Sequence, residues 1–243
     1  MRSTVGLRSA EESAPRWTIW TIALGSAALL VLGILGGLAV RGPLNVTAWH
    51  YLDGPARHVA VRHATPAWKM AFTDVSLLGS AVGAGLAAAI AGAWFWRRTH
   101  WLGSFVLLAL AYALATFLDL ATKAIVRRSP ASGSVSGLLG GSFPSGHAVL
   151  ASAVFGSCAW MVAHSGVRPL LRHGGVALLG LVIVGVAVAR IYLLAHYASD
   201  VLGGLVLGTG AAFVVIRSIP TPAGVPYPDG GAAPSVIGPA SEP

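Results

Sequence analysis

The sequence predicts an all-α membrane protein, a bundle of six transmembrane helices with a polar site at one membrane face. Hydrophobic residues make up 55% of the 243 residues, and the mean hydropathy is +0.74. Charged residues make up only 10%, whereas soluble domains contain roughly a quarter. The hydrophobic residues also gather in six runs of about the length, roughly 20 residues, that a helix needs to cross the hydrocarbon core.

The six runs fill most of the chain and leave room for one domain. The first run is longer than a signal-peptide core of about 7–15 residues and has no clear cleavage site, so we predict that it is a span. We expect a cytoplasmic tail at 1–16, a membrane domain at 17–217 and a tail at 218–243. Seven prolines among the last twenty-four residues predict that this tail is disordered. The expected spans are 17–40, 70–96, 101–126, 147–164, 174–194 and 199–216.

A long segment, 41–69, joins the first two runs. It contains His50, His58 and His63 among aromatic residues, but their spacing matches no common metal motif and no cysteine or carboxylate cluster joins them. We expect an amphipathic stretch at the membrane interface, with a gate over the site as the alternative.

The formal net charge of +8 does not indicate a nucleic-acid partner. The basic residues lie almost entirely between the hydrophobic runs, where membrane topology accounts for them. No basic patch is interleaved with aromatic residues, so we expect no nucleic-acid binding. The single cysteine, Cys158, excludes an internal disulfide.

Three polar clusters lie at the ends of hydrophobic runs, where ionisable groups are costly and typically functional. Lys123 is near the end of the third run and Pro144–His147 opens the fourth. The third cluster runs from the end of the fifth run to the start of the sixth and contains Arg190, His196 and Asp200. An even number of crossings separates the clusters. We therefore expect all three at one end of the helix bundle.

The residue types in these clusters suit a phosphate ester. Lys123, Arg128 and Arg190 offer positive charge, and arginine can bind a phosphoryl group in a bidentate fork. Ser145 and Gly146 stand at a helix start, where free backbone N–H groups and the helix dipole attract anions.

The histidines supply candidate reacting groups. His196 and Asp200 are four residues apart, so in a helix they would share a face, and the carboxylate would hold one ring nitrogen while the other is aimed at phosphorus. This is a nucleophile with an orienting group, and His147 is then free to act as a general acid. Asp119 lies one turn before Lys123, and we expect the two to form a neutralising pair.

This arrangement resembles the type 2 phosphatidic acid phosphatase family, part of the lipid phosphate phosphatase and vanadium haloperoxidase-like superfamily, over roughly residues 70–217. The family segment Pro-Ser-Gly-His is intact at Pro144–His147. The segment Ser-Arg, five residues, His, three residues, Asp is present with both spacings, although Ala189 replaces the serine. The segment Lys, six residues, Arg-Pro departs from the pattern, because Pro130 stands at the arginine position. We expect Arg128 to take that role, with Arg127 as the alternative.

The resemblance implies a reaction and its residues. His196 would attack phosphorus and form a phosphohistidine, Asp200 would orient it, and His147 would protonate the leaving group and then activate water. The resemblance implies no metal and no cofactor. The residues that it implies for holding the phosphate oxygens are Lys123, Arg128, Ser145, Gly146 and Arg190.

The implied substrates are membrane lipid phosphates or diphosphates, such as polyprenyl diphosphate, phosphatidic acid or phosphatidylglycerophosphate. A phosphotransferase with the same intermediate is one alternative. A catalytically impaired protein that binds or transports lipid phosphates is another, although the chain shows no inverted repeat and its polar groups gather at one end. The sequence leaves the oligomeric state open.

The orientation follows from the basic residues. With the N-terminus in the cytoplasm, eight of the sixteen fall on each side. Four on the outer side have a proposed chemical role, and setting them aside leaves eight inside against four outside, which favours this orientation. We therefore expect a bacterial plasma membrane protein whose site faces the extracytoplasmic side. The four residues set aside are Lys123, Arg127, Arg128 and Arg190.

Overall fold

The computed structural model describes residues 16–100, 102–131 and 141–219, and every regular element in these ranges is helical. The predicted all-α class is therefore confirmed. The predicted tails, 1–16 and 218–243, lie almost entirely outside the described residues. The elements are α1 (Arg16–Arg41), α2 (Asn45–Ala48), the π-helical turn η1 (Trp49–Asp53), α3 (Gly54–Arg62), α4 (Pro66–Leu77), α5 (Ala81–Thr99), α6 (Gly103–Val126), α7 (Gly146–Ala163), α8 (Pro169–Tyr192) and α9 (Ala198–Ser218).

Five helices in the described part of the chain, α1, α6, α7, α8 and α9, are long and apolar enough to cross a membrane. The sixth candidate span is a pair, α4 and α5, bent by 52°. The prediction of one continuous helix over 70–96 is wrong at this point. The Ser80 hydroxyl accepts a hydrogen bond of 3.0 Å from Gly83 N and caps α5, so the helix starts anew inside the apolar run.

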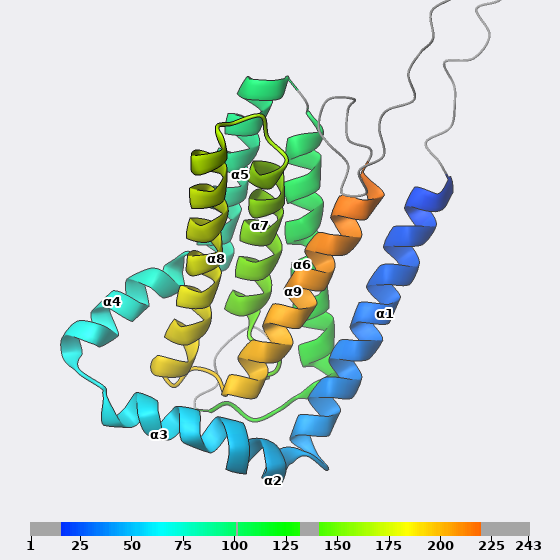
Figure 1. The fold of residues 1–243 in the computed structure, drawn as a ribbon. Coiled ribbons are helices and arrows are strands. Elements are labelled where there is room, and N and C mark those ends of the chain that lie inside the picture. The colour runs from blue at the N-terminus through cyan, green and yellow to red at the C-terminus, as the bar shows by residue number, and fades with distance from the viewer. Residues whose placement is uncertain (1–15, 101, 132–140, 220–243) are drawn as a thin grey trace, which may run out of the picture.

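Helix α7 forms the centre of the bundle, packing against α5, α6, α8 and α9 (Figure 1). The share of its span that is buried is 61%, compared with 11% for α1 and 17% for α8. Helix α9 approaches it closely through small residues. A Cβ on Gly204 would lie 2.7 Å from the carbonyl oxygen of Ser145, so glycine permits this contact.

The segment that joins α1 to α4 lies across one end of the bundle (Figure 1). Its elements α2, η1 and α3 run beneath the ends of the long helices, with η1 in contact with α9 and α3 in contact with α8. The location of this segment at the membrane interface stays a prediction. The segment is also partly buried, because Asp53 at the end of η1 is only 2% exposed.

Candidate active site

The three polar segments meet at the end of the bundle that α2 and α3 cross (Figure 1). Backbone hydrogen bonds join them directly. Ser145 N, before α7, donates to the carbonyl oxygen of Asp200 in α9 at 2.9 Å, and Ser142 N donates to that of Arg128, after α6, at 2.8 Å. The loop that leads into α7 is thereby fixed between the ends of α6 and α9.

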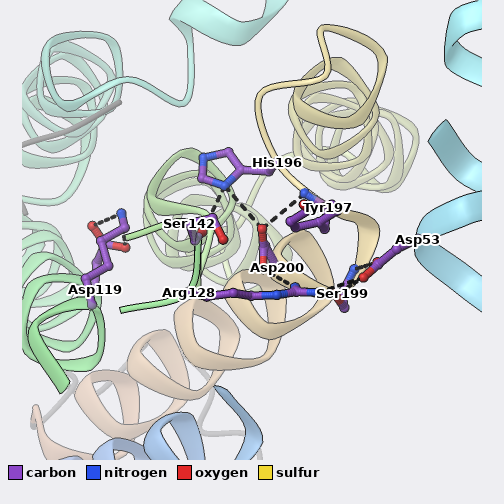
Figure 2. A network of polar contacts seen from close by, with 9 residues as sticks. Asp53, Asp119, Arg128, Ser142, His196, Tyr197, Ser199 and Asp200 are labelled. Carbon is purple, nitrogen blue, oxygen red and sulfur yellow. Dashed lines mark hydrogen bonds and ion pairs between the residues drawn. The ribbon is translucent and has the colours of Figure 1, made fainter. Parts of the chain in front are cut away.

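His196 lies in the turn between α8 and α9, so the condition for a shared helix face with Asp200, that both residues lie in one helix, is not met. The ring is oriented by a backbone carbonyl: its Nδ1 lies 2.9 Å from the oxygen of Ser142 and 3.7 Å from Asp200 Oδ2 (Figure 2). A carbonyl oxygen only accepts hydrogen bonds, so Nδ1 carries the proton. In the neutral ring Nε2 therefore keeps its lone pair, as a nucleophile requires.

Asp200 explains why α9 begins after His196. It is the third residue of α9, and its Oδ2 accepts a hydrogen bond of 3.0 Å from Tyr197 N, which caps the helix at that point. Its Oδ1 accepts a hydrogen bond of 2.5 Å from Arg128 Nη1. This fully buried carboxylate thus joins the helix cap, the arginine and the side of the His196 ring that carries Nδ1.

Arg128 is buried among acceptors (Figure 2). Its Nη1 donates to Ser199 Oγ at 2.7 Å as well as to Asp200, its Nη2 donates to Asp53 Oδ2 at 2.9 Å, and its guanidinium group lies 4.4 Å from the centre of the Tyr197 ring. Burial lowers the pKa of the Arg128 guanidinium, but Asp200 and Asp53 outweigh it and hold that pKa above its ordinary value. Both terminal nitrogens of Arg128 thus donate to oxygen atoms of the protein. The predicted role of Arg128 in binding the phosphate stays a prediction.

Asp53 and Ser199 are members of the network that sequence reasoning missed. Asp53 Oδ1 accepts a hydrogen bond of 2.8 Å from Ser199 N, and Asp53 Oδ2 accepts one of 2.8 Å from Ser199 Oγ. The carboxylate therefore ties η1 to the first turn of α9. One signal was present in the sequence: Asp53 is the only acidic residue in the segment 41–69.

Lys123 and Asp119 form the expected pair, with Nζ lying 2.7 Å from Oδ1 and 2.8 Å from Oδ2. The pair packs against the start of α7. A Cβ on Gly146 would lie 2.8 Å from Asp119 Oδ2 and 3.1 Å from Lys123 Nζ, so only glycine leaves room for the pair beside the helix terminus. The ammonium group is thus held next to the predicted anion site, with its charge partly balanced.

Arg190 and His147 complete the cluster. Arg190 Nη1 donates a hydrogen bond of 2.9 Å to Ser76 Oγ. Ser76 belongs to α4, and nothing in the sequence singled it out. His147 lies within electrostatic range of Arg190, His196 and Lys123. The turn between α4 and α5 covers His147, since a Cβ on Gly79 would lie 3.3 Å from His147 Cβ.

Several buried polar atoms at this site lack a partner among the described residues. Buried polar groups are nearly always hydrogen-bonded. Nevertheless, Arg190 Nε and the hydroxyl groups of Ser142 and Ser145 have no partner in the described part of the chain. Each can donate to the oxygen atoms of an anion. The site therefore combines an oriented imidazole, a second histidine, unsatisfied donors and a helix N-terminus.

Within the described ranges, no three His, Cys, Asp or Glu residues are placed to hold a metal ion together. The donors collected here, arginine, lysine, hydroxyl and backbone N–H groups, instead suit the oxygen atoms of a phosphate.

Comparisons with known proteins bear on the family and the fold. The family model of the PAP2 superfamily matches residues 104–222, which include every site residue predicted from the sequence. Among solved structures, the fold matches the first transmembrane PAP2-type phosphatidylglycerolphosphate phosphatase from Bacillus subtilis, with a TM-score of 0.65 and 23% identity, over 78% of this chain and 93% of that chain. A comparison with curated protein sequences finds no significant match. Asp53 and Ser76 lie outside the segment that the family model matches.

Proposed function

The chain belongs to the PAP2 superfamily, and we propose on this basis that it hydrolyses the phosphate monoester or diphosphate of a membrane lipid through a phosphohistidine at His196. The observation that carries the proposal is the 2.9 Å hydrogen bond between His196 Nδ1 and the oxygen of Ser142. It supports the tautomer in which Nε2 is the free nitrogen, at the end of the bundle where the hydroxyl groups of Ser142 and Ser145 have no partner among the described residues.

In the first step, Nε2 of His196 attacks phosphorus and the bond between phosphorus and the leaving oxygen breaks. His147 donates a proton to that oxygen, so the lipid departs as an alcohol, or as a monophosphate if the substrate is a diphosphate. In the second step, His147 removes a proton from water, the water oxygen attacks phosphorus, and the P–N bond breaks. Inorganic phosphate leaves and both histidines return to their starting states.

Hydrogen-bond donors that are already in place would stabilise the negative charge that develops on the phosphoryl oxygens. Arg190 Nε, the Ser145 hydroxyl and the backbone N–H groups at the start of α7 supply hydrogen bonds, and Lys123 supplies charge beside Gly146. Donors that are fixed before the reaction stabilise a transition state without the cost of reorientation. Arg128 acts through Asp200, whose carboxylate it holds near the His196 ring.

The location of the site favours lipid substrates. It lies at the end of a bundle whose outer surface is apolar, so a substrate tail can stay in the lipid while the phosphate reaches the polar residues. We propose polyprenyl diphosphate, phosphatidic acid and phosphatidylglycerophosphate as the substrate classes, in a bacterial plasma membrane with the site on the extracytoplasmic side. The Bacillus subtilis protein of similar fold is a phosphatidylglycerolphosphate phosphatase by name, which supports including the third class.

Phosphate release by the purified full chain from these three lipids, measured with EDTA present, tests the proposal. We expect activity that survives EDTA and is lost in His196→Ala. His58→Ala is the matched control, because this exposed histidine lies at the same end of the bundle in α3. Acid-labile, base-stable phosphate should be trapped on wild-type protein only. Activity retained by His196→Ala would reject the assignment of His196 as the nucleophile.

A further inference from the structure

A polar cavity of about 410 Å³ opens at the end of the bundle that holds the candidate active site. Three arginines line it, Arg41, Arg127 and Arg128, and the rest of its wall is formed by Asn45, Trp49, Ser129 and Tyr197. None of the residues to which we assign a chemical step, His147, His196 and Asp200, lines this cavity. It shares Arg128 and Tyr197 with the polar network around Asp200.

Two of the three arginines have no carboxylate partner within the described residues. Arg128 is balanced by Asp53 and Asp200, but the ion pairs of the described chain include neither Arg41 nor Arg127. Both are exposed at the mouth of the cavity. The positive charge that faces the cavity therefore comes mainly from these two side chains.

Both guanidinium groups are also held in position. Arg41 Nη1 donates to the carbonyl oxygen of Val126 at 2.6 Å, and Arg127 Nε donates to that of Ala124 at 2.9 Å. Each bond uses one of the five N–H groups of an arginine. The end of α6 thus holds the guanidinium groups of Arg41 and Arg127. Their remaining N–H groups are available to a ligand with several acceptor oxygens.

The surroundings of the cavity are those of a membrane interface. Arg41 is the last residue of the span α1, and the exposed side chains of Leu38, Leu44 and Val46 lie next to the cavity in sequence. Trp49 is 48% exposed, as an interfacial tryptophan is. A lipid whose head group occupied the cavity would place its chains along the apolar surface of α1.

We propose that this cavity binds the phosphate group of an anionic lipid that is not the substrate. Paired guanidinium groups bind phosphate through charge-assisted, bidentate hydrogen bonds. Asn45 in the cavity wall offers a further donor. The ligand class is an anionic phospholipid with a phosphodiester head group, such as phosphatidylglycerol.

Native mass spectrometry of the full chain in detergent, titrated with phosphatidylglycerol or with phosphatidylcholine, measures this site. We expect the first phosphatidylglycerol to bind about tenfold more tightly than phosphatidylcholine, and Arg41→Gln/Arg127→Gln to remove most of that difference. Equal affinities of the wild-type protein for the two lipids would overturn the proposal. Because phosphatidylglycerol has no terminal phosphate to hydrolyse, this result does not depend on the proposed reaction.

Two further variants separate the site from general electrostatics and from misfolding. Arg62→Gln/Lys69→Gln removes two exposed positive charges at the same end of the bundle and should bind phosphatidylglycerol like wild type. An equal loss in this control would overturn the proposal. Asn45→Asp keeps both arginines but places a negative charge in the cavity, and it should weaken binding about tenfold with an unchanged melting temperature. Unchanged binding in Asn45→Asp would also overturn it.

The source of the phosphate group is tested with sodium phosphate alone. If the site takes a lipid, inorganic phosphate at millimolar concentration should neither raise the melting temperature of lipid-free protein nor displace phosphatidylglycerol. Saturable stabilisation by phosphate that is lost in Arg41→Gln/Arg127→Gln would instead show a site for the soluble ion, and would overturn the lipid assignment.

Discussion

Asp53 Oδ2 lies 2.9 Å from Arg128 Nη2, although the two residues are 75 positions apart and Asp53 belongs to the segment that crosses the end of the bundle. Both side chains are buried. Because Arg128 also binds Asp200, this ion pair connects the segment between α1 and α4 to the carboxylate beside His196. That segment is therefore a structural part of the candidate active site.

Asp53→Asn tests that connection. The substitution keeps the shape but removes the charge, which leaves Arg128 balanced by Asp200 alone. We expect the free energy of unfolding to fall by about 3 kcal/mol and kcat to fall by about tenfold, with KM nearly unchanged, because Arg128 then draws Asp200 away from the His196 ring. Thermal unfolding in detergent and steady-state kinetics measure the two effects. Asp74→Asn, at an exposed carboxylate in α4, is the control and should alter neither quantity.

His147→Gln separates acid catalysis from positioning. An alkoxide leaving group needs a proton, so we expect hydrolysis of a lipid phosphate to slow by about 10²–10⁴-fold. A nitrophenolate leaves without one, so a nitrophenyl phosphate should still release one nitrophenol per protein at nearly the wild-type rate. Rapid-mixing absorbance records this burst. A comparable loss with both leaving groups would contradict the general-acid role.

Gly146→Ala tests the close contact between α7 and the Asp119–Lys123 pair. The added Cβ would lie 2.8 Å from Asp119 Oδ2, so the pair must move. We expect activity to drop at least about tenfold and stability to drop by about 1–3 kcal/mol. Gly156→Ala, on the same helix, is the matched control because a Cβ there meets nothing within 4 Å. That protein should be as active as wild type and up to about 1 kcal/mol more stable.

The proposed orientation is tested with single cysteines in a Cys158→Ala background. A membrane-impermeant maleimide added to intact spheroplasts should label the His58→Cys protein, because α3 lies at the end of the bundle that holds the site. The Arg97→Cys substitution lies near the C-terminal end of α5, at the end of the bundle opposite to α3 (Figure 1). The maleimide should label this protein only after permeabilisation. The reverse pattern of labelling would place the site in the cytoplasm.

Hydropathy predicted the spans because a helix hydrogen-bonds its own backbone N–H and C=O groups inside a bilayer, where water cannot. The length of each helix is then set by the thickness of the membrane. The meeting of the three polar segments followed from counting crossings. The Asp119–Lys123 pair followed from helix geometry, since residues four apart in a helix are neighbours. These inferences depend on local spacing and topology, which a sequence displays directly.

The missed features depend on contacts between distant segments or on local competition. The bonds from Asp53 to Ser199 span 146 positions, and no pattern in the segment 41–69 indicates their partner. Ser80 caps a helix inside an apolar run, so hydropathy alone predicts one helix where there are two. His196 falls outside α9 because the carboxylate of Asp200 caps that helix at Tyr197, an outcome that the spacing of four does not distinguish from a shared helix face.

The bridge from η1 to α9 also limits how the protein can be divided. A fragment cut to the stretch that the family model matches would carry both histidines and Asp200, yet Arg128 and Ser199 would lose the carboxylate that holds them. A hybrid that exchanges the N-terminal third for that of a relative needs an acid at the position of Asp53 to hold Arg128 and Ser199 in place.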